Sequence, residues 1–218
     1  MENAFLAHVD EQLSWVGMQN ANNIMYNAGF NSELHVGGVL SSYASAGFTK
    51  RDLLDKMVES KMFVILAHGN AREEAGKIIG KNVLLDGLGH VFLETEDIYD
   101  FETDECLDLS NSEVVIFLGC QTANHPTESL PEAAFWAGAD YAIGFLENIK
   151  LSGANAWIEA FAESYVAGFD IEESAWAIAY DIGENSGDGS GDGSDDGSDD
   201  GSEDTPNNGI SSIEIYCN

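Results

Sequence analysis

Two residue types that together perform acyl-transfer chemistry each follow a strand-length run of apolar residues. His68 comes directly after the run Met62–Ala67, and Cys120 comes after the run Val114–Leu118 and one glycine. A thiol can act as a nucleophile when an imidazole activates it and then protonates the leaving amine. Either residue alone is more often structural, but the paired pattern predicts a Cys-His catalytic dyad of His68 and Cys120.

A glycine lies beside each of these two residues. Gly69 follows the histidine, and Gly119 precedes the cysteine. Glycine lets the backbone turn sharply and lets a substrate approach closely. We therefore expect the backbone N–H groups of Gly69 and Cys120 to form an oxyanion hole, in which they stabilise the negative charge that develops on the attacked carbonyl.

Other residues near the pair are weaker candidates for chemistry. His125 lies five residues beyond Cys120, but a His-Pro pair in a loop is more often structural or exposed. Thr122 and Asn124 are expected to shape the loop that carries the cysteine. Cys106 lies in an acidic segment that makes it a poor nucleophile, and Cys217 is predicted to be structural. The three cysteines have no metal-ligand spacing and do not support a disulfide scaffold.

The dyad requires a scaffold that brings two strand ends together. Apolar strand-length runs alternate with amphipathic helical patterns along the chain, and the central runs are apolar on both faces. This pattern predicts an α/β fold, a three-layer sandwich with a mainly parallel central sheet and helices on both faces. Functional groups in such folds gather beyond the carboxyl ends of the central strands. The predicted strands are Asn3–Val9, Leu34–Leu40, Met62–Ala67, Val83–Leu85, His90–Leu93, Val114–Leu118, Tyr141–Leu146 and Ile210–Tyr216.

The predicted helices begin at recognisable capping residues. Ser14 is expected to cap a helix that runs to about Asn27, and Thr49 a second helix. Pro131 is expected to open a third helix, and an acidic helix or loop is expected over residues 96–109. Two further amphipathic helices are predicted, at Asn155–Val166 and Ile171–Ile182.

Length and charge limit the possible classes of function. The chain has 218 residues, of which 44% are hydrophobic, so it can bury the core of one domain. Its formal net charge of −31 argues against nucleic-acid and anionic membrane partners, because both are anionic. No apolar run reaches membrane-spanning length, and the amino terminus lacks the pattern of a signal peptide. These features predict a cytoplasmic protein.

Acidic residues are concentrated in one segment that contains no apolar residue. Nine acidic residues lie between Glu184 and Asp204, and removing them from the count leaves −22 on the rest of the chain. Such a segment cannot bury surface. We therefore divide the chain into a main domain at 1–183, an acidic Gly/Ser/Asp-rich flexible insertion at 184–209, and a closing strand of the same domain at 210–218.

Part of the insertion matches the ligand register of a calcium-binding EF-hand loop. Asp192, Asp196, Asp200 and Glu203 fall at loop positions 1, 5, 9 and 12. A GDGS repeat generates such matches by chance, and no amphipathic helix flanks the loop on either side. Diffuse cation binding is therefore the favoured interpretation, and a specific calcium site is the alternative. The predicted chemistry of the dyad requires no cofactor.

Two motifs resemble the caspase-hemoglobinase fold, the superfamily of cysteine peptidases that includes caspases, gingipains and CHAT domains. FVILAHGN (63–70) and VVIFLGCQTAN (114–124) resemble its shared pattern of hydrophobic strands that end in His-Gly and in a small residue with Cys. The segments LETEDI (93–98) and EAAFWAGADYAIGFLENI (132–149) are most similar to CHAT domains, and the similarity covers residues 60–182. Glu147 departs from the family by standing where CHAT domains commonly have Trp, and Gly119 by replacing the commoner Ala.

The resemblance implies that Cys120 is the nucleophile, His68 the general acid/base, and Gly69 an oxyanion-hole donor with the Cys120 amide. It implies a cysteine endopeptidase whose partner is a protein or peptide substrate. The alternative is a latent or non-catalytic caspase-like scaffold, regulated by a protein partner or by cations on the acidic loop.

The carboxylates near the strand ends predict a preference for a basic residue at P1, the position before the scissile bond. Only two arginines occur in the chain, so a pocket that binds aspartate is poorly supplied. Glu147 and Asp10 follow predicted strands that flank the first specificity pocket in this fold. We therefore predict that Glu147 or Asp10 pairs with Arg or Lys at P1, and the alternative is that both are solvated surface acids.

Overall fold

The computed structural model describes residues 2–9, 15–37, 48–74, 77–85, 91–124, 128–185 and 212–217. Asp10, Ser14, His125, Asp192, Asp196, Asp200 and Glu203 lie outside these ranges. The predicted acidic insertion at 184–209 also lies outside them, except for residues 184–185, which end helix α5 (Ile171–Asn185). None of the helices in the described ranges has the length and apolar character needed to span a bilayer.

The fold is built on a six-stranded sheet in the order β2-β1-β3-β7-β8-β9. The first five strands are parallel, and only β9 runs antiparallel to its neighbour β8. The mainly parallel sheet predicted from the sequence is therefore confirmed. Its strands are β2 (Asn31–Val36), β1 (Asn3–His8), β3 (Met62–Leu66), β7 (Val114–Leu118), β8 (Tyr141–Phe145) and β9 (Ile213–Cys217).

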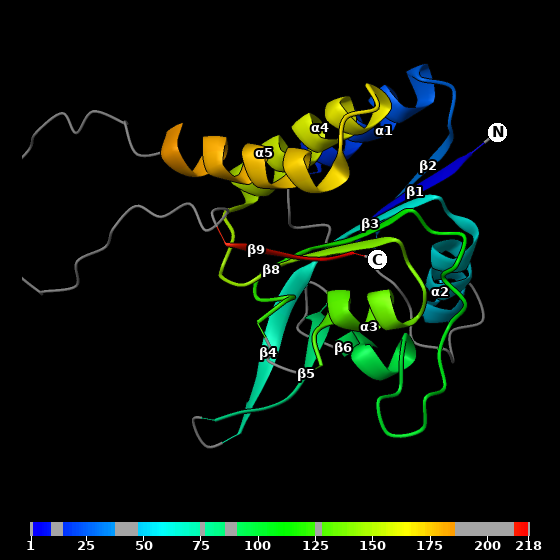
Figure 1. Ribbon diagram of the computed structural model, residues 1–218, viewed down its shortest axis with the longest axis vertical. Helices are drawn as coiled ribbons and strands as arrows, with labels where there is room; N and C mark the ends of the chain where they lie inside the picture. Colours follow the sequence, from blue (N-terminus) through cyan, green and yellow to red (C-terminus); the bar gives the residue numbers. More distant parts are fainter. Residues whose placement is uncertain are drawn as a thin grey trace, which may run out of the picture.

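Helices cover both faces of this sheet, so the molecule has three layers (Figure 1). Successive side chains of a strand point to opposite faces, and every residue of β3 and β7 is buried, so each face needs a cover. One face packs against α1 (Val16–Asn27), α4 (Leu151–Val166) and α5. The other face packs against α2 (Lys50–Glu59) and α3 (Leu130–Trp136). This arrangement confirms the predicted α/β sandwich.

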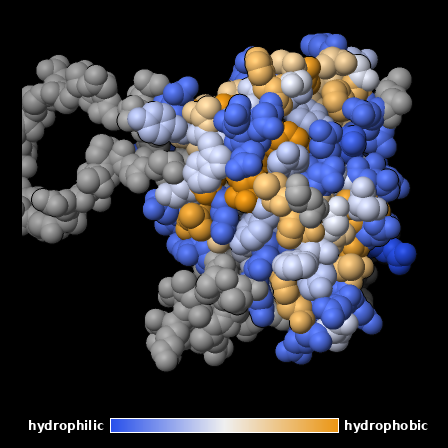
Figure 2. Space-filling view, viewed as in Figure 1, coloured by the Kyte–Doolittle hydropathy of each residue, from blue (hydrophilic) through white to orange (hydrophobic). Residues whose placement is uncertain are grey.

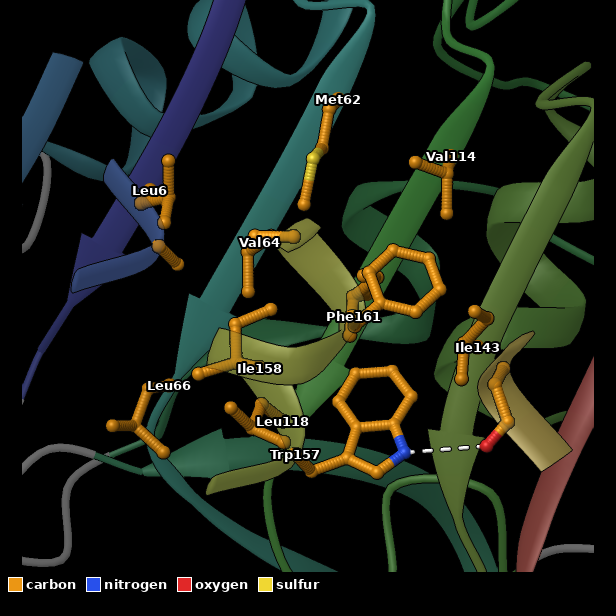
Figure 3. Close-up of a cluster of buried hydrophobic side chains, with 14 of the residues drawn as sticks. Leu6, Met62, Val64, Leu66, Val114, Leu118, Ile143, Trp157, Ile158 and Phe161 are labelled. Carbon is orange, nitrogen blue, oxygen red and sulfur yellow. Dashed lines mark hydrogen bonds between the residues drawn. The ribbon is translucent and has the colours of Figure 1, made fainter. Parts of the chain in front are cut away.

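Two aromatic side chains of α4, Trp157 and Phe161, lie in the hydrophobic cluster between this helix and the sheet (Figure 3). Trp157 is fully buried and stacks on Phe161, with ring centroids 4.9 Å apart. The Trp157 indole N–H donates to the backbone carbonyl of Ala175 in α5 at 3.3 Å. This hydrogen bond satisfies the one polar atom of a side chain that otherwise fills space between the sheet and two helices.

Local sequence signals explain where two of the helices begin. Thr49 accepts a hydrogen bond from the Asp52 amide, and the Asp52 carboxylate accepts one from the Thr49 amide, so the pair forms a capping box. Ser129 caps α3 by accepting from the Glu132 amide, and Pro131 lies in the first turn. The predicted starts at Thr49 and Pro131 are confirmed to within one residue.

A second, three-stranded antiparallel sheet follows β3, and the sequence predicted only part of it. The predicted hairpin around residues 86–87 exists as β5 (Lys77–Leu85) paired with β6 (Val91–Glu94). The strand β4 (His68–Glu74) was not predicted, because its polar composition does not alternate like a half-buried strand. Residues 96–109 contain the end of a 3-10 helix (Thr95–Asp97), one isolated antiparallel bridge between Tyr99 and Cys106, and otherwise turns and irregular chain.

On the face shown in Figure 2, small groups of hydrophobic residues lie among hydrophilic ones. Large exposed hydrophobic side chains include Trp176 and Tyr180 on α5 and Trp136 at the end of α3. Apolar atoms make up a large share of any folded protein surface, so exposed hydrophobic residues do not by themselves indicate a function.

Candidate active site

The two central strands bring His68 and Cys120 to the same edge of the sheet. Strands β3 and β7 are adjacent and parallel, with Leu66 opposite Leu118. The pairing continues one step further, since the Ala67 amide donates to the Leu118 carbonyl at 3.3 Å. Because parallel strands end at the same edge, the residues that follow them also meet there. His68 and Cys120 line one pocket, together with Gly119.

Glycine at 69 and 119 is required by close approach of the two backbones. A Cβ on Gly69 would collide with the Cys120 carbonyl oxygen and lie 2.9 Å from the Thr122 methyl carbon. A Cβ on Gly119 would lie 2.7 Å from the Ala67 carbonyl oxygen and 3.2 Å from the Gly69 nitrogen. Any side chain at either position would push these strand ends apart. The Gly69 and Cys120 backbones are thus in contact, through the Gly69 Cα and the Cys120 carbonyl group.

The loop that carries Cys120 is held by the buried hydroxyl of Thr122. Its Oγ1 donates to the Phe117 carbonyl at 2.9 Å and accepts from the Phe145 amide at 3.0 Å, so it ties β7 to β8. The amide of Gln121, which adopts a left-handed φ of 55°, donates to the Glu147 carbonyl at 3.0 Å. These bonds confirm that Thr122 shapes the loop.

We expect Thr122→Val to disturb this loop, because the variant keeps the shape of the side chain but removes its hydroxyl. The Phe145 amide and the Phe117 carbonyl would each lose a buried hydrogen-bond partner, which costs about 1–3 kcal/mol of folding free energy. Urea unfolding measures this loss. Thr122→Ser keeps the hydroxyl and should lose much less, so equal losses in the two variants would contradict the assignment.

The pocket beside the cysteine has a volume of about 200 Å³. Among its described lining residues, Ile149 from the loop before α4 and Leu151 and Ala154 from α4 complete the pocket beyond the two central strand ends. The Cys120 Sγ lies 3.7 Å from the Ile149 carbonyl oxygen, a weak S–H···O hydrogen bond. Cys120 is half-buried, and His68 is exposed, so both side chains are accessible from the pocket mouth.

Of the predicted P1 partners, Glu147 is exposed in the loop after β8. The Glu147 backbone carbonyl accepts a hydrogen bond from the Gln121 amide of the loop that carries Cys120. Glu147 is not among the described residues that line the pocket. Asp10 lies outside the described residues. Pairing of either carboxylate with a basic P1 residue therefore stays a prediction.

No cluster of potential metal ligands occurs within the described part of the chain. The four predicted calcium ligands lie outside it. The cysteines Cys106 and Cys217 are both free and exposed, and the Cys217 Sγ lies 3.9 Å from a Glu172 carboxylate oxygen. The end of β9 is therefore a surface position.

Sequence reasoning missed the contribution of α4 to the pocket. The helix was predicted to begin at Asn155, whereas it begins at Leu151. Two apolar residues, Ile149 and Leu151, flank Lys150 just before the predicted helix start, and this pair was the available signal.

Comparison with known proteins supports the fold and nothing finer. No protein-family model matches the chain, and no curated protein matches it. The fold is similar to the complex of the pro- and mature domains of RgpB from Porphyromonas gingivalis, with a TM-score of 0.53 and 10% sequence identity. The similarity covers 81% of this chain but only 43% of that one. The chain therefore has the caspase-like α/β fold and spans less than half of the matched chain.

Proposed function

We propose that this protein is a cysteine endopeptidase in which Cys120 is the nucleophile and His68 the general acid/base. One observation carries the proposal: both side chains line the same pocket, at the ends of adjacent parallel strands. The caspase-like fold, shared with a cysteine peptidase, is compatible with this chemistry. The closer resemblance to CHAT domains rests on the sequence motifs.

In the proposed reaction His68 accepts the proton of the Cys120 thiol, and the thiolate attacks the carbonyl carbon of the scissile peptide bond. The C–N bond then breaks, and His68 gives the proton to the leaving amine, which leaves a thioester on Cys120. A water molecule gives a proton to His68 as it attacks the thioester. The C–S bond breaks, the carboxylic acid product leaves, and the thiol regains its proton.

The amides of Gly69 and Cys120 are the proposed donors to the oxyanion that forms in both steps. Their backbones are packed so closely that a side chain at 69 cannot be accommodated. Backbone donors that are already oriented require little reorganisation when the charge develops, which is the source of the catalytic effect proposed for them.

We expect Gly69→Ala to lower kcat by about 100-fold, because displacement of catalytic groups by about 1 Å has effects of this size. The matched control is Gly29→Ala, at a glycine with a φ of 95° and open space around its Cβ position. Both variants lose some stability, but only the first should lose activity per folded molecule. Equal kcat in the two variants would remove Gly69 from the proposed site.

The test of the function is cleavage of a mixed library of internally quenched peptides, with mass spectrometry of the products. Wild type is compared with Cys120→Ala and with Cys217→Ala, which removes an exposed thiol elsewhere. The proposal expects cleavage by wild type and Cys217→Ala, and none by Cys120→Ala. Cleavage that survives in Cys120→Ala would contradict it.

A latent form is the second candidate, and the Cys120–Ile149 contact favours it. The Cys120 Sγ lies 3.7 Å from the Ile149 carbonyl oxygen, so the thiol has a hydrogen-bond acceptor other than an imidazole. Movement of the loop before α4, through a partner or through cations, would then be needed to release the thiol. Library cleavage only after addition of calcium or a cell extract distinguishes this form from a constitutively active enzyme.

A further inference from the structure

The pocket beside Cys120 has an almost wholly apolar lining, apart from the dyad itself. Its described residues other than His68, Gly119 and Cys120 are all hydrophobic: Leu66, Ala67, Leu118, Ile149, Leu151 and Ala154. No carboxylate, ammonium or guanidinium group occurs in this described lining. Of the two predicted P1 partners, Glu147 is not among these described lining residues, and Asp10 lies outside the described part of the chain.

Rigid elements form the floor and one wall of the pocket. Leu66 and Leu118 are opposite each other on β3 and β7, and both are buried. Figure 3 shows them on the α4 side of the sheet, near Ile158 and Trp157. The wall is the first turn of α4, where Ala154 is buried and Leu151 half-buried. The apolar surface is therefore part of the packed core and not a mobile flap.

The volume of the pocket suits one side chain. At about 200 Å³ it is smaller than the roughly 300–1,000 Å³ typical of pockets for drug-sized ligands. When Cys120 attacks a carbonyl carbon, the side chain nearest to the sulfur belongs to the P1 residue, whose Cα is bonded to that carbon. The pocket that Cys120 lines is thus placed to receive the P1 side chain.

An uncharged P1 side chain fits this apolar pocket better than a charged one. Burial of apolar atoms is favourable, whereas a guanidinium or ammonium group without a buried partner loses its hydration without compensation. The strongly negative field of the protein attracts basic peptides from solution, but it acts on the whole peptide and does not supply a partner inside the pocket.

We propose that the pocket formed by Leu66, Leu118, Ile149, Leu151 and Ala154 is an apolar P1 subsite that selects peptides with Leu, Met or Phe at P1. This inference rests on the proposed peptidase function and is an alternative to the basic P1 preference predicted from the sequence. Arg and Lys at P1 are poor substrates because the described lining offers them no carboxylate.

The test is a fluorogenic peptide series that differs only at P1, with Leu, Met, Phe, Ala, Arg, Lys, Asp and Asn, measured on wild type and Cys120→Ala. We expect kcat/KM for the peptide with Leu at P1 to be at least about tenfold higher than for the Ala peptide. It should be about 100-fold higher than for the Arg peptide. Cleavage after Arg, Lys, Asp or Asn at or above the Leu rate, lost in Cys120→Ala, overturns the apolar subsite but leaves the peptidase. Cleavage of no peptide, together with no alkylation of Cys120 by iodoacetamide, overturns both.

A charge placed in the pocket should change the preference. Leu151→Glu adds a carboxylate at the first residue of α4, and we expect it to lower cleavage after Leu by at least about tenfold while raising cleavage after Arg. Val16→Glu is the matched control, because Val16 is the exposed first residue of α1 and is not among the described pocket residues. Val16→Glu should keep the wild-type preference.

Leu151→Ala keeps the proposal falsifiable if Leu151→Glu fails to fold. This variant enlarges the pocket without adding charge and should shift the preference from Leu toward Phe. An unchanged P1 profile in Leu151→Ala would contradict the placement of the P1 side chain against α4.

Discussion

Cys120→Ala is expected to lower kcat of peptide cleavage by at least about 10⁴-fold, the largest change in activity that any single substitution in this chain should cause. Removal of the nucleophile eliminates the covalent route altogether, and triad enzymes lose activity on a similar or greater scale when theirs is removed. Any remaining rate comes from binding and the oxyanion hole. Initial rates on the best substrate of the P1 series, at equal concentrations of folded protein, measure the effect.

His68→Ala should lower kcat by about 10²–10⁴-fold, the usual contribution of a general acid/base. In a double variant with Cys120→Ala the two effects should not add, because the residues act as one unit. Added imidazole should restore part of the activity of His68→Ala but none of that of Cys120→Ala. Additive losses would show that the two side chains do not work in the same step.

Trp157→Ala is expected to cause the largest loss of stability, about 3–5 kcal/mol of unfolding free energy. The side chain is fully buried, stacks on Phe161 at 4.9 Å, meets the Phe145 ring edge-on at 5.5 Å and donates to the Ala175 carbonyl. Its removal leaves a cavity between the sheet and α4 and frees one buried carbonyl. For a chain of this length, the loss corresponds to a fall in Tm of about 10 °C.

The matched control for this prediction is Trp176→Ala, at a tryptophan on α5 that is 44% exposed. We expect it to cost less than about 1 kcal/mol, since substitutions at exposed positions leave no cavity. Urea unfolding followed by circular dichroism compares the two. Similar losses in both variants would mean that α4 is not packed on the sheet as described. Because the first turn of α4 also lines the pocket, Trp157→Ala should weaken peptide cleavage as well.

Much of the central sheet could be predicted from the sequence, because its signals are local. The runs Met62–Leu66 and Val114–Leu118 contain only apolar residues, as strands covered on both faces require, and their bounds were predicted to within one residue. Thr49 and Pro131 are helix-start signals that act within one turn. The placement of His68 and Cys120 at one edge of the sheet also followed from local information, since both come after strands that parallel packing aligns.

The sheet of β4, β5 and β6 and the chemistry of the pocket were decided only by the tertiary structure. Strand β4 is polar, and its pairing with β5, not its own periodicity, makes it a strand. Leu66, Leu118 and Leu151 come together from three separate segments, and nothing in their local sequence distinguishes a pocket wall from an ordinary core. For the same reason the sequence could predict that Glu147 follows a strand, but it could not predict whether the Glu147 side chain faces a substrate. Composition and periodicity determined which strands form, whereas contacts between distant segments decided what surrounds the thiol of Cys120.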